Sequence, residues 1–181
     1  AASKEVITAN PLDPKYADEQ MLMGPVISAK SKKFILGMIE AGIAEGATLA
    51  LDGRGITVPG CEKGHFIGPT VFTDVKPGME IHRTEIFGPV VVASKISSLE
   101  EVPAIANDTV YGLAASIWTQ NLSSAHRLAA QVRAGTVWIN CHSMYDATLP
   151  IGGVKQSGWG RDSGHQALDN YLENKTVCAV I

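Results

Sequence analysis

The chain is organised around the stretch Glu85-Ile86-Phe87-Gly88-Pro89-Val90, which leads into the apolar run 90–93. Successive side chains of an extended chain point to opposite sides, so Glu85 and Phe87 are expected to face the same way. An acid and an aromatic ring that face the same way, before a Gly-Pro turn and a buried strand, are able to bind a ligand that has a sugar hydroxyl and a flat ring. Taken alone, the pattern favours the simpler interpretation, which is the start of a strand with one solvated acid and one core phenylalanine.

Composition and charge place the chain among globular proteins of about one domain. It has 181 residues, of which 45% are hydrophobic and 18% are charged, and its formal net charge is -3. This charge and the lack of a lysine and arginine cluster argue against a nucleic-acid partner. No apolar run reaches membrane-spanning length and no secretory signal is visible, so the sequence predicts a cytoplasmic protein with no membrane partner. The three cysteines, an odd number, indicate free thiols.

Helices and strands are expected to alternate along most of the chain. Residues 1–24 have the proline, aspartate and glycine content of an irregular connector. Apolar spacing and turn residues then predict, in order, a helix from Ser28 to about Gly46, strands at 48–51, 69–75 and 90–96, a helix capped by Ser97 or Ser98, a strand at 112–118, a helix at 122–132, a strand at 136–140, a short helix at 165–171 and a strand at 175–180. We therefore expect an α/β fold with a mainly parallel open sheet flanked by helices.

Two groups of residues invite a chemical interpretation that their spacing does not support. The glycine-rich run 152–164 contains Lys155 and Ser157, but it lacks the residue order of a phosphate-binding fingerprint. Its glycines are expected to allow close backbone approach in a loop. Cys141 and His142 are neighbours on an extended chain, so their side chains point to opposite faces and do not easily form a nucleophile and base.

A metal pair and an ionic group are the remaining candidates. Cys61 and His65 are spaced as two metal ligands, but no further pair completes a site, so no metal is expected. Arg161, Asp162 and Glu173 form a possible ionic group around the last short helix. A solvated surface explains these three residues equally well.

Four ordered motifs give the chain a resemblance to a known family. They are Glu85–Val90, Asn107-Asp108 followed by Tyr111–Ala115, Gly135–Asn140, and Pro150–Asp162. With these motifs the chain resembles the NAD(P)-dependent aldehyde dehydrogenase superfamily from about Asp13 to the C-terminus. The later half looks like the betaine-aldehyde and phenylacetaldehyde dehydrogenases, whereas the loop at 53–68 is similar to that of the methylmalonate-semialdehyde dehydrogenases. No single substrate is assigned for this reason.

The resemblance implies domain boundaries and a cofactor clamp. Residues 25–172 would form a partial catalytic domain of the aldehyde dehydrogenase type, with an incomplete sheet, and 173–181 would form an oligomerisation strand. Glu85 would hydrogen-bond the nicotinamide ribose hydroxyls of NAD or NADP, and Phe87 would pack beside the nicotinamide.

The resemblance also implies an aldehyde pocket and subunit contacts. The residues that would line the pocket are Leu113, Ser143, Tyr145 and Ile151, and Ile151 stands where the family usually has phenylalanine. Asp162 takes the place of a glutamate that helps a proton relay, on a shorter arm. The residues that would contact another subunit are Arg161, Glu173, Lys175 and Val177.

In the family, the region before this part supplies the nucleotide-binding domain, the general-base glutamate and the nucleophilic cysteine. None of those motifs is found here, so we expect the C-terminal part of an enzyme, inactive and without bound cofactor when alone. The complete enzyme would oxidise a small aldehyde. The expected partners are further copies, as a dimer or tetramer, or a missing N-terminal half. Two alternatives stay open: a non-catalytic oligomerising module, and an unrelated thiol enzyme that uses Cys141 or Cys61.

Overall fold

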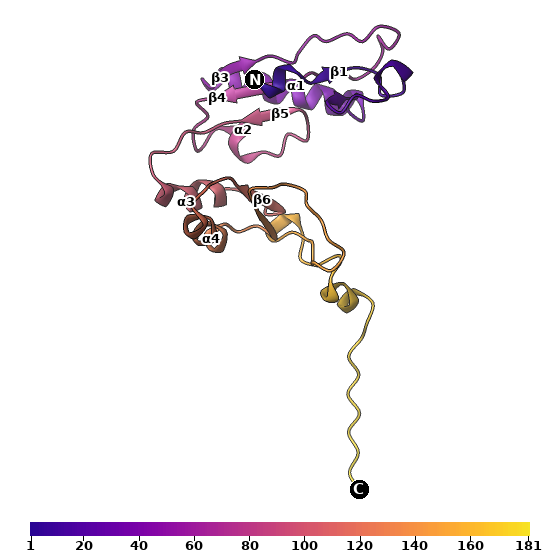
Figure 1. The fold of residues 1–181 in the computed structure, drawn as a ribbon, viewed down its shortest axis with the longest axis vertical. Helices are drawn as coiled ribbons and strands as arrows, with labels where there is room; N and C mark the ends of the chain where they lie inside the picture. Colours follow the sequence, from indigo (N-terminus) through magenta and orange to yellow (C-terminus); the bar gives the residue numbers. More distant parts are fainter. The chain divides into compact units, whose positions relative to one another are not determined.

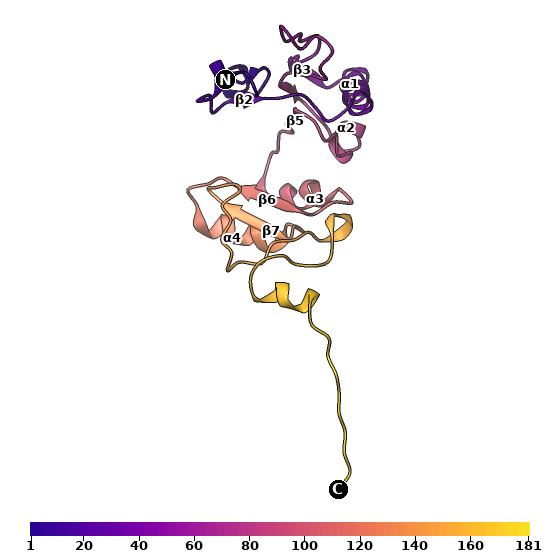
Figure 2. The ribbon, with the colours of Figure 1, turned by 90° about the vertical axis from the view of Figure 1, so that its right-hand side faces the viewer.

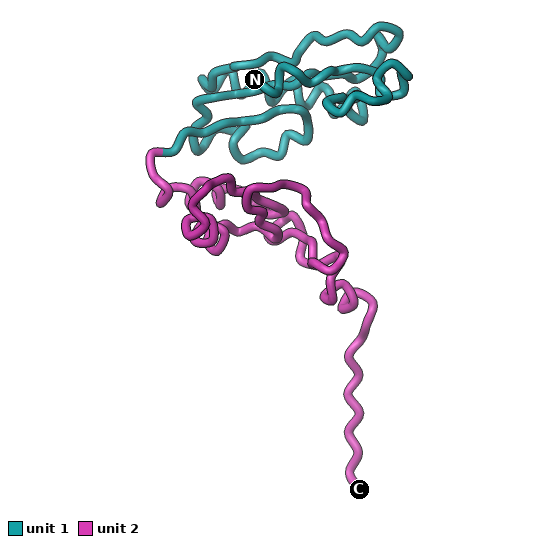
Figure 3. The backbone as a smooth tube through the Cα atoms, viewed as in Figure 1, with its two compact units in different colours: residues 1–96 teal, residues 97–181 magenta.

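The computed structural model describes residues 1–181 and divides them into two compact units, Ala1–Ile96 and Ser97–Ile181 (Figure 3). Small, mostly parallel sheets flanked by helices confirm the predicted α/β class. The domain boundaries at 24/25 and 172/173 stay a prediction. No helix of the chain has the length and apolar character needed to cross a bilayer.

The first unit holds a three-stranded sheet and one long helix, α1 (Ala29–Ala44) (Figure 1). Its strands in sheet order are β3 (Thr48–Leu51), β4 (Thr70–Thr73) and β5 (Val90–Val92). The β3–β4 pair is antiparallel and the β4–β5 pair is parallel. A smaller parallel pair joins β1 (Ile7–Thr8) to β2 (Leu22–Met23). Short helices complete the unit: η1 (Ala2–Lys4), η2 (Pro14–Tyr16) and α2 (Glu80–Arg83).

Helix α1 forms where the sequence predicts it, because both of its ends carry specific signals. The Ser28 hydroxyl accepts a hydrogen bond from the backbone N–H of Ser31 at 3.1 Å, which caps the first turn. Gly46 adopts a φ of +88°, a left-handed conformation that ends helices. The inner face of the helix buries Ile35 and Ile39 completely against Phe72 of β4, which is also 0% exposed. This apolar cluster is the core of the first unit.

The second unit is a βαβ arrangement with a long C-terminal segment. Strands β6 (Ala114–Ile117) and β7 (Thr136–Ile139) are parallel neighbours, joined through α4 (Leu122–Gln131) (Figure 2). The Asn121 side chain caps α4 by accepting from the N–H of Ser124 at 2.9 Å. The other helices are η3 (Leu99–Glu101), α3 (Val102–Asn107), η4 (Lys155–Ser157) and η5 (His165–Asn170).

Several predicted elements differ from the structure. The strand expected at 90–96 ends at Val92, whose partner Phe72 lies next to the end of β4 at Thr73. Asp74 then adopts a φ of +58°, which interrupts the strand, although the N–H of Val75 still donates to the Ala93 carbonyl at 3.3 Å. The helix expected after Ser97 or Ser98 begins as η3, and Ser98 makes no side-chain capping bond. The strand expected at 175–180 is extended but has no strand partner in this chain (Figure 1). The sheet is also divided into three small sheets instead of one.

Candidate functional site

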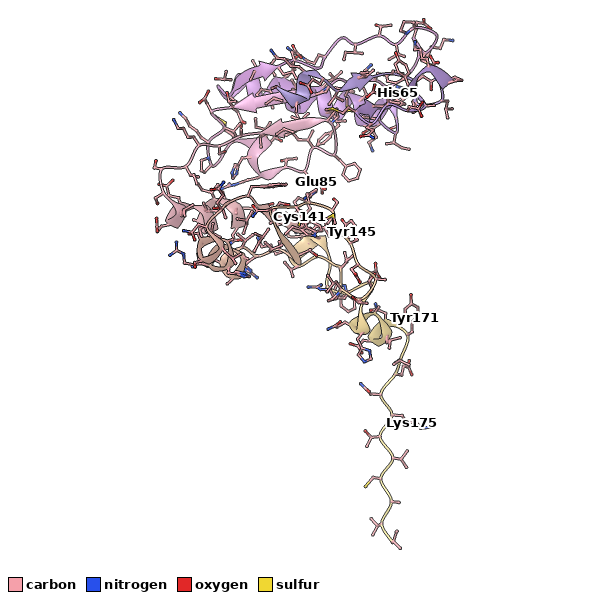
Figure 4. The ribbon with its side chains drawn as sticks, viewed as in Figure 1. His65, Glu85, Cys141, Tyr145, Tyr171 and Lys175 are labelled. Carbon is pink, nitrogen blue, oxygen red and sulfur yellow. The ribbon has the colours of Figure 1, made fainter.

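In the stretch Glu85–Val90, the acid Glu85 and the ring of Phe87 are exposed to solvent on either side of a core residue. Ile86 is 8% exposed and packs into the core of the first unit. Glu85, labelled in Figure 4, and Phe87 are both exposed. The Phe87 side chain is 80% exposed. The interpretation of Phe87 as a core phenylalanine is therefore wrong, and both side chains are accessible to a ligand.

Phe87 is held in a strained backbone conformation by its neighbours. Its φ is +52°, in the left-handed region that bulky residues avoid. The next residue, Gly88, lies so close to Ile35 that an added Cβ would come within 2.6 Å of its Cδ1 atom. The carbonyl of Pro89 then accepts a hydrogen bond from the N–H of Thr70 at 2.8 Å, which fixes the turn to β4. Strain maintained in this way is concentrated at ligand sites in proteins.

Three of the four predicted pocket residues line one cavity of about 340 Å³ in the second unit. The cavity is lined by Leu113, Ala114, Thr136, Trp138, His142, Tyr145 and Ile151. Ser143, the fourth predicted residue, is exposed, has a φ of +54° and is not part of this wall. The structure therefore brings Leu113, Tyr145 and Ile151 together and leaves Ser143 at the edge of the loop.

Trp138 also lines this cavity, and the sequence did not predict it as a pocket residue. Its indole is 9% exposed, and its Nε1–H donates to the carbonyl of Met144 at 3.0 Å. The rings of His142 and Tyr145 meet it edge-on, with centroids 5.0 and 5.5 Å away. Thr136 and Trp138 alternate along β7 and so share a face, which is the signal that points to them.

A hydrogen-bonded turn shapes the loop between Tyr145 and Ile151. The Thr148 hydroxyl donates to the Asp146 carboxylate at 2.6 Å, and the Thr148 backbone N–H donates to the same oxygen at 2.8 Å. Both bonds favour the charged carboxylate, so they hold the pKa of Asp146 below its ordinary value. The bond from the Thr148 hydroxyl contributes most, followed by the bond from the Thr148 N–H. The turn positions Tyr145 at the cavity.

Asp162 is held at the cavity through its backbone. Its N–H and carbonyl each pair with Ile151 at 2.7 Å, in an isolated antiparallel bridge. The side chain is exposed and lines a second cavity of about 430 Å³, to which Leu113, Ile151 and Arg161 also contribute. Asp162 therefore lies beside Ile151, in a cavity that shares Leu113 and Ile151 with the predicted pocket.

Arg161 braces the glycine-rich loop and forms no ion pair. Its Nη1 donates to the carbonyls of Gly153 and Gly160, each at 2.8 Å. Neither Asp162 nor Glu173 pairs with it within this chain, and its contact with a carboxylate of another subunit stays a prediction. Glu173, Lys175 and Val177 lie in the exposed C-terminal segment, in which Figure 4 labels Lys175, and their subunit contacts stay a prediction.

The Lys155 side chain caps the C-terminal end of helix α3. Its ammonium donates to the carbonyls of Asn107 and Thr109, at 3.1 and 3.0 Å, at the C-terminal end of α3, where a cation is favourable. In the same loop the Ser157 hydroxyl accepts from the N–H of Gly112 at 3.0 Å. The polar groups of the glycine-rich run thus serve the fold of the second unit.

Replacing Lys155 with methionine is expected to lower the unfolding free energy of the second unit by about 1–3 kcal/mol, because two charge-assisted hydrogen bonds are lost. Urea titration followed by tryptophan fluorescence measures this loss, since Trp118, Trp138 and Trp159 all lie in that unit. Lys175→Met is the matched control in the exposed segment and should leave the midpoint unchanged. Equal midpoints for the two variants would contradict the capping role.

The thiols and imidazoles predicted as alternatives do not assemble into a reactive group. Nδ1 of His142 lies 2.7 Å from the Ser116 hydroxyl on β6, so the adjacent Cys141, which is half-buried, is not its partner. Cys61 is half-buried in the wall of a mostly apolar cavity of about 520 Å³ that also includes Leu12 and Phe66. No group of three or more histidine, cysteine, aspartate or glutamate residues is placed to hold a metal ion.

Comparison with known proteins gives one consistent result. Residues 2–177 match the aldehyde dehydrogenase family. The betaine aldehyde dehydrogenase of Brucella anthropi is 47% identical over 160 residues, which is 88% of this chain and 33% of that protein. The chain therefore spans about a third of the length of the curated relatives it matches.

Solved structures agree with this result. The betaine aldehyde dehydrogenase from Staphylococcus aureus in complex with NAD+ matches with a TM-score of 0.85 and 36% identity, over 95% of this chain and 33% of that one. A mutant of aldehyde dehydrogenase C from Pseudomonas syringae, in complex with NAD+ and octanal, matches with a TM-score of 0.84 and 39% identity, over 94% of this chain and 34% of that one.

Proposed function

Because this chain belongs to the aldehyde dehydrogenase family, we propose that it is part of an enzyme that oxidises an aldehyde to a carboxylic acid with NAD or NADP. Its own contribution is the nicotinamide clamp and one wall of the aldehyde pocket. The 181 residues contain none of the family's motifs for the nucleophile, the general base or the nucleotide-binding domain. The polypeptide alone is therefore proposed to be inactive.

The observation that carries this proposal is the exposed pair Glu85 and Phe87, fixed on both sides of buried Ile86. A carboxylate accepts hydrogen bonds from two adjacent ribose hydroxyls, and a phenyl ring packs against a flat nicotinamide. When bound, the nicotinamide supplies the hydride acceptor. Glu85 and Phe87 orient it, and the left-handed backbone at Phe87 sets the direction in which its side chain leaves the chain.

The pocket residues supply the second half of the proposal. Leu113, Tyr145 and Ile151 give the aldehyde an apolar wall that excludes water from the reacting centre. Asp162, anchored to Ile151 through two backbone bonds, is placed to accept a proton from a water molecule beside that wall.

The exposed C-terminal segment is proposed to pair with another copy of the chain. Val177 is 82% exposed and Val180 is 99% exposed, and the backbone from 173 to 181 has no strand partner. An extended apolar segment with free backbone groups is a template for strand addition. A dimer or tetramer in the cytoplasm is the expected state of the complete enzyme.

A chimera tests the catalytic proposal. Residues 1–181 replace the C-terminal third of the Brucella anthropi relative, and NADH formation is followed by absorbance with the aldehyde of that relative. The chimera is expected to turn over. Glu85→Gln should raise KM for NAD about tenfold, because one charge-assisted hydrogen-bond acceptor is lost.

Glu80→Gln is the matched control, since Glu80 is exposed on α2 outside the proposed clamp. Identical KM values for the two variants would remove Glu85 from the cofactor site. A folded chimera that forms no NADH, while the 181-residue chain still self-associates in light scattering, would favour the non-catalytic oligomerising module.

A further inference from the structure

The wall of the 340 Å³ cavity contains no fixed charge. Its seven side chains include no aspartate, glutamate, lysine or arginine, and its apolar part comes from Leu113, Ala114 and Ile151. Burying a charged ligand group in such a place is costly unless an opposite charge compensates it. The cavity therefore suits the neutral end of a molecule.

The aromatic rings of the cavity that are accessible to a ligand are those of Tyr145 and His142, and both carry polar atoms. Trp138 is 9% exposed and its N–H is already used, so its indole is a support and offers little surface. Tyr145 is 62% exposed and His142 is also exposed, and both lean on the indole. A single accessible phenol ring makes a poor cage for a quaternary ammonium group, which gains most from several aromatic faces.

His142 is fixed in place and keeps one nitrogen for a ligand. The Ser116 hydroxyl occupies Nδ1 at 2.7 Å, whereas Nε2 has no hydrogen-bond partner in the chain. Whether Nε2 donates or accepts depends on the tautomer that Ser116 selects. The Thr136 hydroxyl in the same wall is buried without a partner. Buried polar atoms are normally paired, so the Thr136 hydroxyl favours a ligand with a hydrogen-bonding group, and the exposed Nε2 of His142 offers that group a second partner.

We propose that His142, held by Ser116, is the specificity-determining residue of this pocket. The pocket selects aldehydes whose far end is a neutral flat ring with a hydrogen-bonding substituent, such as a hydroxylated aryl group, over aldehydes with a quaternary ammonium group. This inference rests on the proposed function, since the cavity is the proposed aldehyde pocket. It assigns a role to Ser116 on β6, which the sequence did not single out, and to His142 in the loop after β7, which the sequence offered only as a base for Cys141.

Binding of unreactive alcohols to the 181-residue chain tests this preference without any turnover. The probes are 2-(4-hydroxyphenyl)ethanol, 2-phenylethanol and choline, and the readout is the NMR shift of the Trp138 indole N–H. The hydroxylated probe is expected to bind about three- to tenfold tighter than 2-phenylethanol, as one hydrogen bond contributes. Choline is expected to bind more weakly than either.

Two variants and one control locate the effect. His142→Phe keeps a ring against Trp138 and should remove the preference for the hydroxylated probe, whereas Ser116→Ala frees the imidazole and should reduce it. Ser123→Ala, on the exposed side of α4, should change nothing. The proposal is overturned if choline binds tightest, if no probe binds the folded chain, or if the preference survives both substitutions. A chimera without turnover that keeps the preference would overturn only the proposed function.

Discussion

Gly135→Ala is expected to prevent the folding of Ser97–Ile181. A Cβ atom on Gly135 would lie 1.7 Å from the carbonyl oxygen of Gly152 and 2.8 Å from its carbonyl carbon. Both atoms are backbone, so no side-chain rotation relieves the overlap. The N–H of Gly135 also donates to the carbonyl of Gly112 at 3.0 Å, which ties the start of β7 to the segment before β6. We expect a loss of more than about 4 kcal/mol, at the upper end for one substitution.

Tryptophan fluorescence during urea unfolding measures this loss, because all three tryptophans belong to the second unit. Gly160→Ala is the matched control in the same loop system, since the nearest atom to its added Cβ is Asn170 Oδ1 at 3.6 Å, an ordinary contact. The control should unfold like the parent chain. A Gly135→Ala chain with a native emission spectrum and an unchanged midpoint would show that the two loops are not packed as described.

The same glycine illustrates what the sequence makes predictable. Strand β7, helix α4 and helix α1 were predicted because each has local signals: a β-branched and aromatic run in β7, an apolar stripe in α4, and an apolar stripe with a side-chain cap at Ser28 in α1. The need for glycine at position 135 depends instead on Gly152, which is distant in the sequence. Contacts of that kind follow from the tertiary fold and leave no local pattern.

In the candidate site, too, local patterns were predicted from the sequence, whereas contacts between distant residues were not. The alternation rule predicted only that Glu85 and Phe87 face the same way, and the pattern taken alone favoured a buried Phe87, so only the structure shows the exposed ring and its φ of +52°. The register of β6 against β7 places Ser116 opposite Trp138, and the chain then returns so that His142 reaches Ser116. These residues are 26 positions apart, and no spacing rule connects them.

Charged residues were the least predictable part of the site. For Arg161 the sequence left an ionic group and a solvated surface equally open, and its guanidinium donates to two carbonyls of this chain. The Lys155 ammonium likewise donates to two backbone carbonyls, that of Asn107 at the end of α3 and that of Thr109. Long cationic side chains have many partners within reach, so their choice depends on which backbone acceptors the folded loop leaves unpaired.

The purified 181-residue chain is expected to form no NADH from any aldehyde. Aldehyde oxidation of the family's type needs a thiolate nucleophile beside the nicotinamide, and removal of such a group costs on the order of a millionfold in rate. Cys141 is half-buried with no base beside it, Cys61 lines a cavity of the first unit, and Cys178 lies in the exposed C-terminal segment. None of the three has the surroundings of an activated thiol.

Absorbance at the NADH band with several aldehydes, together with calorimetry of NAD binding, measures both parts of this expectation. The active chimera is the positive control, because it carries the same 181 residues. NAD is expected to bind more weakly than micromolar, since Glu85 and Phe87 would contact only its nicotinamide half. Steady NADH formation that Cys141→Ala abolishes would replace the proposal with a thiol enzyme centred on that residue. Formation that survives both Cys141→Ala and Cys61→Ala would place the reacting group elsewhere in the chain, and the clamp alone would no longer describe its function.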